Sequence, residues 1–158
     1  MAQERFASHS EVATNASADV NSFPLLLQSA ASRGYQIYEV ISALKAAASD
    51  TRHITEVSAG VTTAFTGTTA VVPVPIYIGG AAATVLAFSA TSVAPTPAAL
   101  PILRLPHNGR ATVRWAAIDP DSRLTAQAAA GLNGQLFVIN RNSGAAAIGT
   151  ENTVFHAE

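Results

Sequence analysis

A mainly β fold, an antiparallel β-sandwich or jelly roll preceded by an N-terminal arm and a short helical segment, is predicted by three features of the sequence. After Asp50, short runs of Thr, Val, Ile and Phe alternate with Gly, Pro and Asn, as in proteins built from many short strands. Dipeptides typical of tight turns separate several of these runs, which favours antiparallel neighbours. Apolar and polar residues alternate within the runs, so each strand has one face for a core and one for solvent. The strand-helix-strand order of a parallel α/β sheet is not found.

The composition limits the class of protein. The 158 residues, of which 49% are hydrophobic and 12% charged, correspond to one globular domain. The absence of cysteine excludes disulfides, thiol catalysis and cysteine-bound zinc. A formal net charge of -1 provides no basic stripe for phosphate groups, so no nucleic-acid partner is predicted. The polar start does not resemble a signal peptide and no apolar run reaches the roughly 18 residues of a membrane helix, so no membrane partner is predicted.

Residues 1–21 are predicted to form a polar N-terminal arm. The stretch is rich in Ser, Ala, Asn and acidic residues, and its only sizeable apolar side chains are Phe6, Val12 and Val20. Such a segment buries too little apolar surface to offset its own ordering entropy. We therefore expect the arm to be mobile or to be ordered on another surface.

Residues 22–50 are predicted to be a short helical segment. A first helix is expected over about Pro24 to Arg33, because Ser22 can cap its start and proline suits a first helical turn. A second helix, ending near Ala48, is favoured by apolar residues that recur at three- and four-residue spacing. The alternative for this part is a strand over Tyr35–Ile41, YQIYEVI, whose β-branched and aromatic residues prefer that state.

Residues 51–158 are predicted to form the β-sandwich domain. The candidate strands are Ile54–Val57, Val61–Thr66, Thr69–Ile78, Thr84–Ser89, Ala99–Leu105, Ala111–Ile118, Arg123–Ala128, Gln135–Asn140 and Thr153–Ala157. Several of them are separated by residues that are typical of tight turns, namely Gly79-Gly80, Asn108-Gly109, Asp119-Pro120-Asp121-Ser122, Asn133-Gly134 and Ser143-Gly144. Because proline has no N–H for a ladder, Pro73 and Pro75 make Thr69–Ile78 an expected edge strand.

No pattern of catalytic, cofactor-binding or metal-ligating residues is found. The G-x-S-x-G elbow and the phosphate-binding glycine loop are missing, and the four histidines are far apart in the sequence. Asp119 and Asp121 resemble the start of a calcium loop, but the glycine and the further acid of that motif are absent. We expect instead a solvated turn in which an aspartate accepts hydrogen bonds from the local backbone. The sequence therefore predicts a protein that is not an enzyme and has no cofactor.

Four arginines are the candidate contacts to a partner. The chain has eight arginines and one lysine, and guanidinium groups suit ion pairs at protein interfaces. The arginines that lie close together in the sequence are Arg104, Arg110, Arg114 and Arg123. The alternative interpretation of this cluster is a solvated polar face.

The only tryptophan, Trp115, alternates with Val113 on the apolar side of its strand and is expected to pack in the core. Exposure of Trp115 and Tyr77 would instead favour a glycan-binding surface. Many of the predicted core positions are alanine, which leaves little side-chain volume for a core. Contact between subunits would compensate, so we expect a homo-oligomer.

The C-terminal stretch Arg114–Glu158, RWAAIDPDSRLTAQAAAGLNGQLFVINRNSGAAAIGTENTVFHAE, follows a cysteine-free domain rich in Ala, Thr, Val and Gly. In its composition and in this C-terminal stretch, the chain resembles the small accessory virion proteins of tailed bacteriophages. The resemblance implies a capsid decoration or cement protein, a β-sandwich or jelly roll that is often a homotrimer and binds where subunits of the major capsid protein meet. It also implies a place on the capsid surface of the virion, after assembly in the host cytoplasm. No functional residue of the family can be assigned to a position in this sequence.

Two alternatives belong to other classes of protein. A tail-fibre or head-fibre module that binds a host surface glycan or protein would also be β-rich and oligomeric. A glycan hydrolase would need two converging carboxylates, and the only candidates are Asp119, Asp121 and Glu151.

Overall fold

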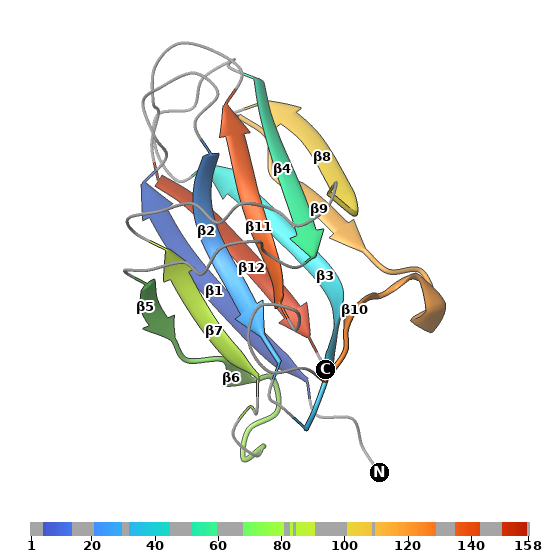
Figure 1. Cartoon of the computed structure of the whole chain (residues 1–158). Helices are drawn as coiled ribbons and strands as arrows, with labels where there is room; N and C mark the ends of the chain where they lie inside the picture. The colour runs from blue at the N-terminus through green and yellow to red at the C-terminus, as the bar shows by residue number, and fades with distance from the viewer. Residues whose placement is uncertain are drawn as a thin grey trace.

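A computed structural model describes residues 5–13, 21–29, 32–44, 52–59, 68–80, 83, 85–90, 101–108, 110–128, 135–142 and 150–157. The protein is mainly β, as predicted, and its strands form two six-stranded sheets in which every pairing is antiparallel. Figure 1 shows the two sheets one in front of the other. Among the described residues there is no helix with the length and hydrophobicity needed to cross a membrane.

The two sheets, here called sheet A and sheet B, share no strand. Sheet A has the order β10 (Leu124–Ala126), β3 (Tyr35–Leu44), β12 (Thr150–Ala157), β1 (Phe6–Ala13) and β6 (Val74–Pro75), with β9 (Val113–Ala116) also paired to β3. Sheet B has the order β5 (Thr68–Val71), β7 (Leu86–Ala90), β2 (Asn21–Gln28), β11 (Gln135–Asn142), β4 (Arg52–Ala59) and β8 (Leu103–Asn108). A 3-10 helix, η1 (Pro120–Ser122), separates β9 from β10.

The helical segment predicted over residues 22–50 is wrong, and the alternative strand over Tyr35–Ile41 is confirmed. β2 pairs with β7 and β11, and β3 pairs with β12, β9 and β10. The helix-like spacing has a physical cause in a bulge at Tyr38, since Ala157 pairs with Ile37 and His156 pairs with Glu39. The extra residue moves the core-facing positions from odd to even numbers, so Ile37 and Val40 are both fully buried at a spacing of three.

The stretch expected to be an arm, residues 1–21, is part of a sheet where it is described. Phe6–Ala13 forms β1, which pairs with β12 along its whole length and with β6 at its start. Burial of Phe6 and the ladder to β12 offset the ordering entropy that the polar composition alone could not. Sheet A thus combines strands from all three stretches into which the sequence was divided.

Most strands predicted after residue 51 are found within a few residues of their expected positions. Pro73 lies between β5 and β6, which are edge strands of sheet B and sheet A respectively, so the edge prediction for Thr69–Ile78 is confirmed. The predicted strand Val61–Thr66 and the turns at Asn133-Gly134 and Ser143-Gly144 lie outside the described residues.

The core lies between the sheets and receives side chains from both. The buried cluster consists of Leu27, Val57, Val85 and Ala87 with Tyr35, Ile37, Val40, Ala126 and Ala157. The Tyr35 hydroxyl on sheet A donates to the Leu27 carbonyl on sheet B at 2.8 Å, which joins the sheets by a buried hydrogen bond. Full burial of a side chain such as Ile37 contributes about 1.5–3 kcal/mol, whereas the three alanines contribute much less.

Candidate binding surface

The four arginines predicted as partner contacts do not form one surface. Arg104 on β8 is on the outer face of sheet B, because its neighbours Leu103 and Leu105 point inward. Arg114 on β9 is on the outer face of sheet A, opposite the half-buried Trp115. Arg110 lies in the turn between β8 and β9, where its backbone N–H donates to Asn108 Oδ1 at 3.0 Å. Only Arg114 and Arg123, which precedes β10, are on the same sheet.

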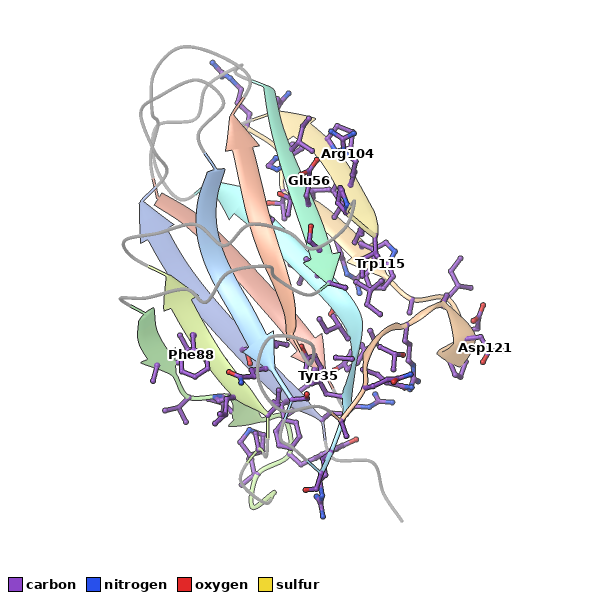
Figure 2. The ribbon with its side chains drawn as sticks, in the orientation of Figure 1. Tyr35, Glu56, Phe88, Arg104, Trp115 and Asp121 are labelled. Carbon is purple, nitrogen blue, oxygen red and sulfur yellow. The ribbon has the colours of Figure 1, made fainter. Side chains whose placement is uncertain are left out.

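Arg104 forms an ion pair with Glu56 on the neighbouring strand β4. The distance from Arg104 Nε to Glu56 Oε1 is 2.7 Å, and the two residues are direct cross-strand partners. The side chain of Arg104 is 59% exposed, whereas that of Glu56 is only 2% exposed. Figure 2 shows the labelled side chains of Glu56 and Arg104 beside each other along β4 and β8. The pair places a basic partner beside a nearly buried carboxylate at the edge of sheet B.

Arg114 forms the equivalent pair on sheet A. Its Nε donates to Oε1 of Glu39 on β3, and the side chains are 66% and 10% exposed respectively. Arg114 pairs in register with Ile41, so the ion pair runs diagonally between β9 and β3.

The outer face of sheet A gathers further charged and aromatic groups around the bulge at Tyr38. The guanidinium carbon of Arg5 lies 5.3 Å from the centroid of the Tyr38 ring, within cation–π range. Burial raises the pKa of Tyr38, the charges of Arg5 and Arg123 oppose that rise, and Glu39 and Tyr77 add to it. We call Arg5, Tyr38, Arg114 and Arg123 the Tyr38 surface.

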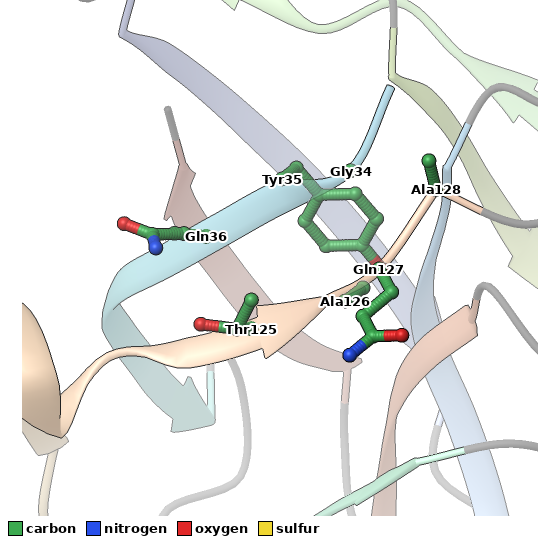
Figure 3. Close-up of a pocket in the computed structure, with 7 residues that line it drawn as sticks. All are labelled: Gly34, Tyr35, Gln36, Thr125, Ala126, Gln127 and Ala128. Atoms are coloured by element: carbon green, nitrogen blue, oxygen red, sulfur yellow. The ribbon is translucent and has the colours of Figure 1, made fainter. Parts of the chain in front are cut away.

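An open hollow lies next to the Tyr38 surface. It has a volume of about 360 Å³ and is lined by Gly34, Tyr35, Gln36, Thr125, Ala126, Gln127 and Ala128, the two rows of residues drawn in Figure 3. Gln36 connects the two features, because its Oε1 accepts from Arg123 Nη1 at 3.1 Å. A Cβ atom at Gly34 would lie 2.4 Å from the Ala126 carbonyl oxygen, so only glycine allows β3 and β10 to approach this closely.

A run of exposed apolar residues borders the Tyr38 surface on the other side. The large exposed side chains in it are Val72, Val74, Ile76, Tyr77 and Ile78. The run is fixed to β1, since the Ile76 N–H donates to the Arg5 carbonyl at 2.9 Å. It ends in a turn in which Gly80 N–H donates to the Tyr77 carbonyl at 3.0 Å, and Gly79 has the φ of 81° that a type II turn requires at its third position. We call residues 72–78 the apolar edge segment.

His107 is on the inner side of the same β4–β8 pair that carries Arg104 and Glu56. Its Nε2 lies 3.0 Å from the hydroxyl of the buried Thr55, and its Nδ1 lies 3.2 Å from the Asn108 carbonyl oxygen. Both contacts suit a neutral ring in which Nδ1–H donates to the carbonyl and Nε2 accepts from the hydroxyl. Burial lowers the pKa of His107, and the backbone hydrogen bonds with Asn108 and Ala111 partly oppose the change.

Other sequence predictions can be compared directly with the structure. Trp115 packs against the core cluster, as predicted, whereas Tyr77 is 58% exposed. The predicted Asp turn is confirmed, because Asp119 Oδ1 accepts from the Ser122 N–H at 2.9 Å and the Asp119 N–H donates to Ser122 Oγ at 3.2 Å. Figure 2 shows Asp121 at the tip of this projecting turn.

The candidate hydrolase acids do not come together. Glu151 pairs with Leu44 at one end of β3, whereas the turn with Asp119 and Asp121 follows β9 beyond Tyr38, near the other end. Within the described part of the chain, no group of three or more His, Asp or Glu side chains is placed to hold a metal ion.

Four residues of these surfaces were not predicted from the sequence: Arg5, Tyr38, Glu39 and Glu56. Each acid interrupts an otherwise β-type run, Glu39 in YQIYEVI and Glu56 in HITEVS. An acid inside a strand predicts a cross-strand basic partner. The partner could not be identified, because strand order, and not sequence distance, decides which arginine lies beside it.

Comparison of the chain with protein-family models, with curated proteins and with solved structures gives no match.

Proposed function

We propose that this chain is a structural virion protein that decorates and stabilises the capsid of a tailed phage. In this proposal the two sheets form a β-sandwich of the jelly-roll type, and the protein is a homotrimer bound between subunits of the major capsid protein. The resemblance of the sequence to accessory virion proteins supports the proposal, and so does an exposed surface suited to contact with another protein.

The observation that carries the proposal is the apolar edge segment. Ile78 is fully exposed, and Val72 and Tyr77 are 80% and 58% exposed. Apolar side chains concentrated on one edge, next to charged groups, are typical of a protein interaction site. The turn that contains Gly79 and the hydrogen bond to the Arg5 carbonyl hold this segment in place. Little conformational entropy is therefore lost when a partner covers it.

The mechanism is adhesive. A decoration protein binds the assembled shell and not its separated subunits, so its binding free energy adds to the stability of the shell by mass action. Many copies on one capsid, each with several binding surfaces, increase the effect of modest contacts. No catalytic residue is required.

Co-sedimentation tests the proposal. The purified chain is mixed with expanded capsids of a tailed phage, and the pellet is quantified over a range of concentrations. We expect saturable pelleting at a fixed ratio to capsid subunits, together with a higher capsid melting temperature. A chain that stays in the supernatant at all concentrations would reject the proposal.

A second candidate, a fibre module that binds a host surface glycan, is favoured by the exposed Tyr77 beside Tyr38. Sugar rings pack on exposed aromatic side chains, and the guanidinium groups nearby could donate to hydroxyl or carboxylate oxygens. A glycan array distinguishes the candidates: specific glycan binding with no capsid binding would favour the fibre module.

A further inference from the structure

We propose that a projecting turn of one copy of this chain packs into a hollow on a second copy. The projecting turn is residues 117–123, between β9 and β10, and the hollow, here called the Gly34 hollow, is the one whose lining includes Gly34, Ala126 and Ala128. The inference deepens the proposed function and rests on it for the number of copies, which is three. It assigns the residues that join the copies.

The projecting turn is an insertion into one edge of sheet A. Ala116 pairs with Glu39 and Leu124 pairs with Ile37, so the whole of residues 117–123 lies opposite the single residue Tyr38. These residues cannot continue the ladder, and they project from the sheet as Figure 2 shows. A loop held on a rigid sheet is a common place for residues that bind a partner.

Hydrogen bonds hold the projecting turn in one conformation. The Ala117 N–H donates to the Tyr38 carbonyl at 2.8 Å, which fixes the start of the turn to β3. Asp119 and Ser122 cap each other reciprocally around η1, and Pro120 begins that helix. A turn that is already ordered loses little conformational entropy when it enters a partner.

Two side chains of the projecting turn are available to a partner. Ile118 is 97% exposed, the behaviour of an apolar contact residue and not of a core residue. Asp121 is exposed at the tip, and no hydrogen bond or ion pair of its carboxylate is found within the part of the chain that the structure describes. The turn therefore presents an apolar side chain and an unpaired negative charge.

The Gly34 hollow has the complementary properties. Its volume is about 360 Å³, roughly that of ten water molecules, so an isoleucine side chain can enter it. Gly34, Ala126 and Ala128 have no side chain beyond Cβ, which leaves this space open. Arg33, directly before Gly34, is exposed, and among the described residues it too has no hydrogen bond or ion pair.

The two features can satisfy each other only between copies. Within one chain Asp121 and Arg33 do not pair, and Figure 2 shows Asp121 well apart from Tyr35, which lines the hollow. A second copy supplies an apolar surface for Ile118 and an opposite charge for Asp121 at the same time. Because the turn of one copy meets the hollow of the next, the contact is heterologous, and such contacts close into rings.

The contact leaves the apolar edge segment exposed. The projecting turn and the hollow adjoin β10, and the apolar edge segment contains β6, which is at the opposite edge of sheet A. Contact between copies and contact with a capsid therefore use different edges of the molecule.

The test is sedimentation equilibrium of the full chain over a range of concentrations. We expect the wild type to approach three times the mass of one chain. Ile118→Asp, and Ala128→Trp, which fills the hollow, should each raise the midpoint concentration for dissociation at least tenfold. The matched control Arg110→Glu reverses a charge in the β8–β9 turn and should leave the midpoint unchanged.

Charge reversal tests the pairing of Arg33 with Asp121. The single variants Arg33→Glu and Asp121→Arg should each raise the midpoint by roughly threefold or more, because each places like charges together. The double variant Arg33→Glu/Asp121→Arg restores opposite charges and should recover most of the loss. Thermal unfolding of each variant establishes that the fold is intact, and if Ala128→Trp unfolds, the substitutions at exposed Ile118, Arg33 and Asp121 still decide the inference.

Four results would overturn the inference: a wild type that stays monomeric, unchanged assembly of Ile118→Asp, a double charge variant no better than the single variants, or an equal loss in the Arg110 control. A wild-type trimer that none of the variants weakens rejects the contact and leaves the proposed function standing. A wild-type dimer that the same variants dissociate keeps the contact and rejects the trimer of the proposed function.

Discussion

The outer faces of the two sheets carry the same ion pair in different surroundings. On sheet B, Arg104 pairs with Glu56, whose side chain is 2% exposed; on sheet A, Arg114 pairs with Glu39, whose side chain is 10% exposed and lies among Tyr38, Arg5 and Arg123. The first pair balances one buried charge with one arginine, as expected of a structural interaction. The second lies beside Tyr38, on which the charges of Arg5 and Arg123 also act. An arginine near an acid is therefore not by itself a contact residue, and the surroundings decide its role.

The largest effect is expected from Arg104→Met, which keeps the apolar stem and removes the charge. The nearly buried Glu56 would lose its 2.7 Å ion pair. Leaving a buried carboxylate without this compensation costs roughly 2–3 kcal/mol here, less than for a fully buried pair because water reaches the exposed arginine site. Urea denaturation measures the difference in free energy of unfolding. Arg110→Met serves as the control, and equal effects of the two substitutions would contradict the structural role of Arg104.

A smaller loss is expected from Arg114→Met. Glu39 is more exposed than Glu56, and Arg5 and Arg123 remain near Tyr38 to offset part of its charge. We expect a cost of about 1 kcal/mol, close to that of a partly exposed ion pair. The same denaturation experiment provides the comparison. A larger cost for Arg114→Met than for Arg104→Met would reverse our assignment of roles to the two faces.

The smallest stability effect is expected from titration of His107, on the inner side of the β4–β8 pair. Because burial lowers the pKa of His107 below its ordinary value of 6.5, the folded state binds fewer protons than the unfolded state between the folded pKa and about 6.5. The contribution of His107 is therefore complete above pH 6.5 and is lost as the pH falls to the folded pKa. Denaturation curves across this range should show stability rising with pH, and His107→Gln should reduce the slope. An unchanged slope in the variant would contradict the assignment.

Much of the fold could be predicted from the sequence, and the failures have identifiable physical causes. The alternation of apolar and polar residues, together with the turn residues, predicted β4 and the strands from β5 to β12. The proline at Pro73 also predicted an edge position. β3 was predicted as a helix because the bulge at Tyr38 produces a three-residue spacing of buried residues. β1 was missed because its stability comes from pairing with β12, a strand almost the whole chain away in sequence.

The binding surface was less predictable than the strands. Two of its arginines, Arg114 and Arg123, were identified from their number and proximity in the sequence. Arg5 and Tyr38 were not, since the order of strands in sheet A brings them together. Sequence proximity also grouped Arg104 with the others, although it faces outward from the opposite sheet.

The most direct test of the account is capsid occupancy of the Ile78→Asp variant. Ile78 is fully exposed at a turn, so the substitution should leave the melting temperature of the free protein unchanged. If the apolar edge segment is buried against the capsid, loss of the isoleucine contact should weaken binding by roughly tenfold or more. We predict a stable variant that fails to pellet at concentrations where the wild type saturates the capsids. A variant that occupies capsids as fully as the wild type would contradict the account.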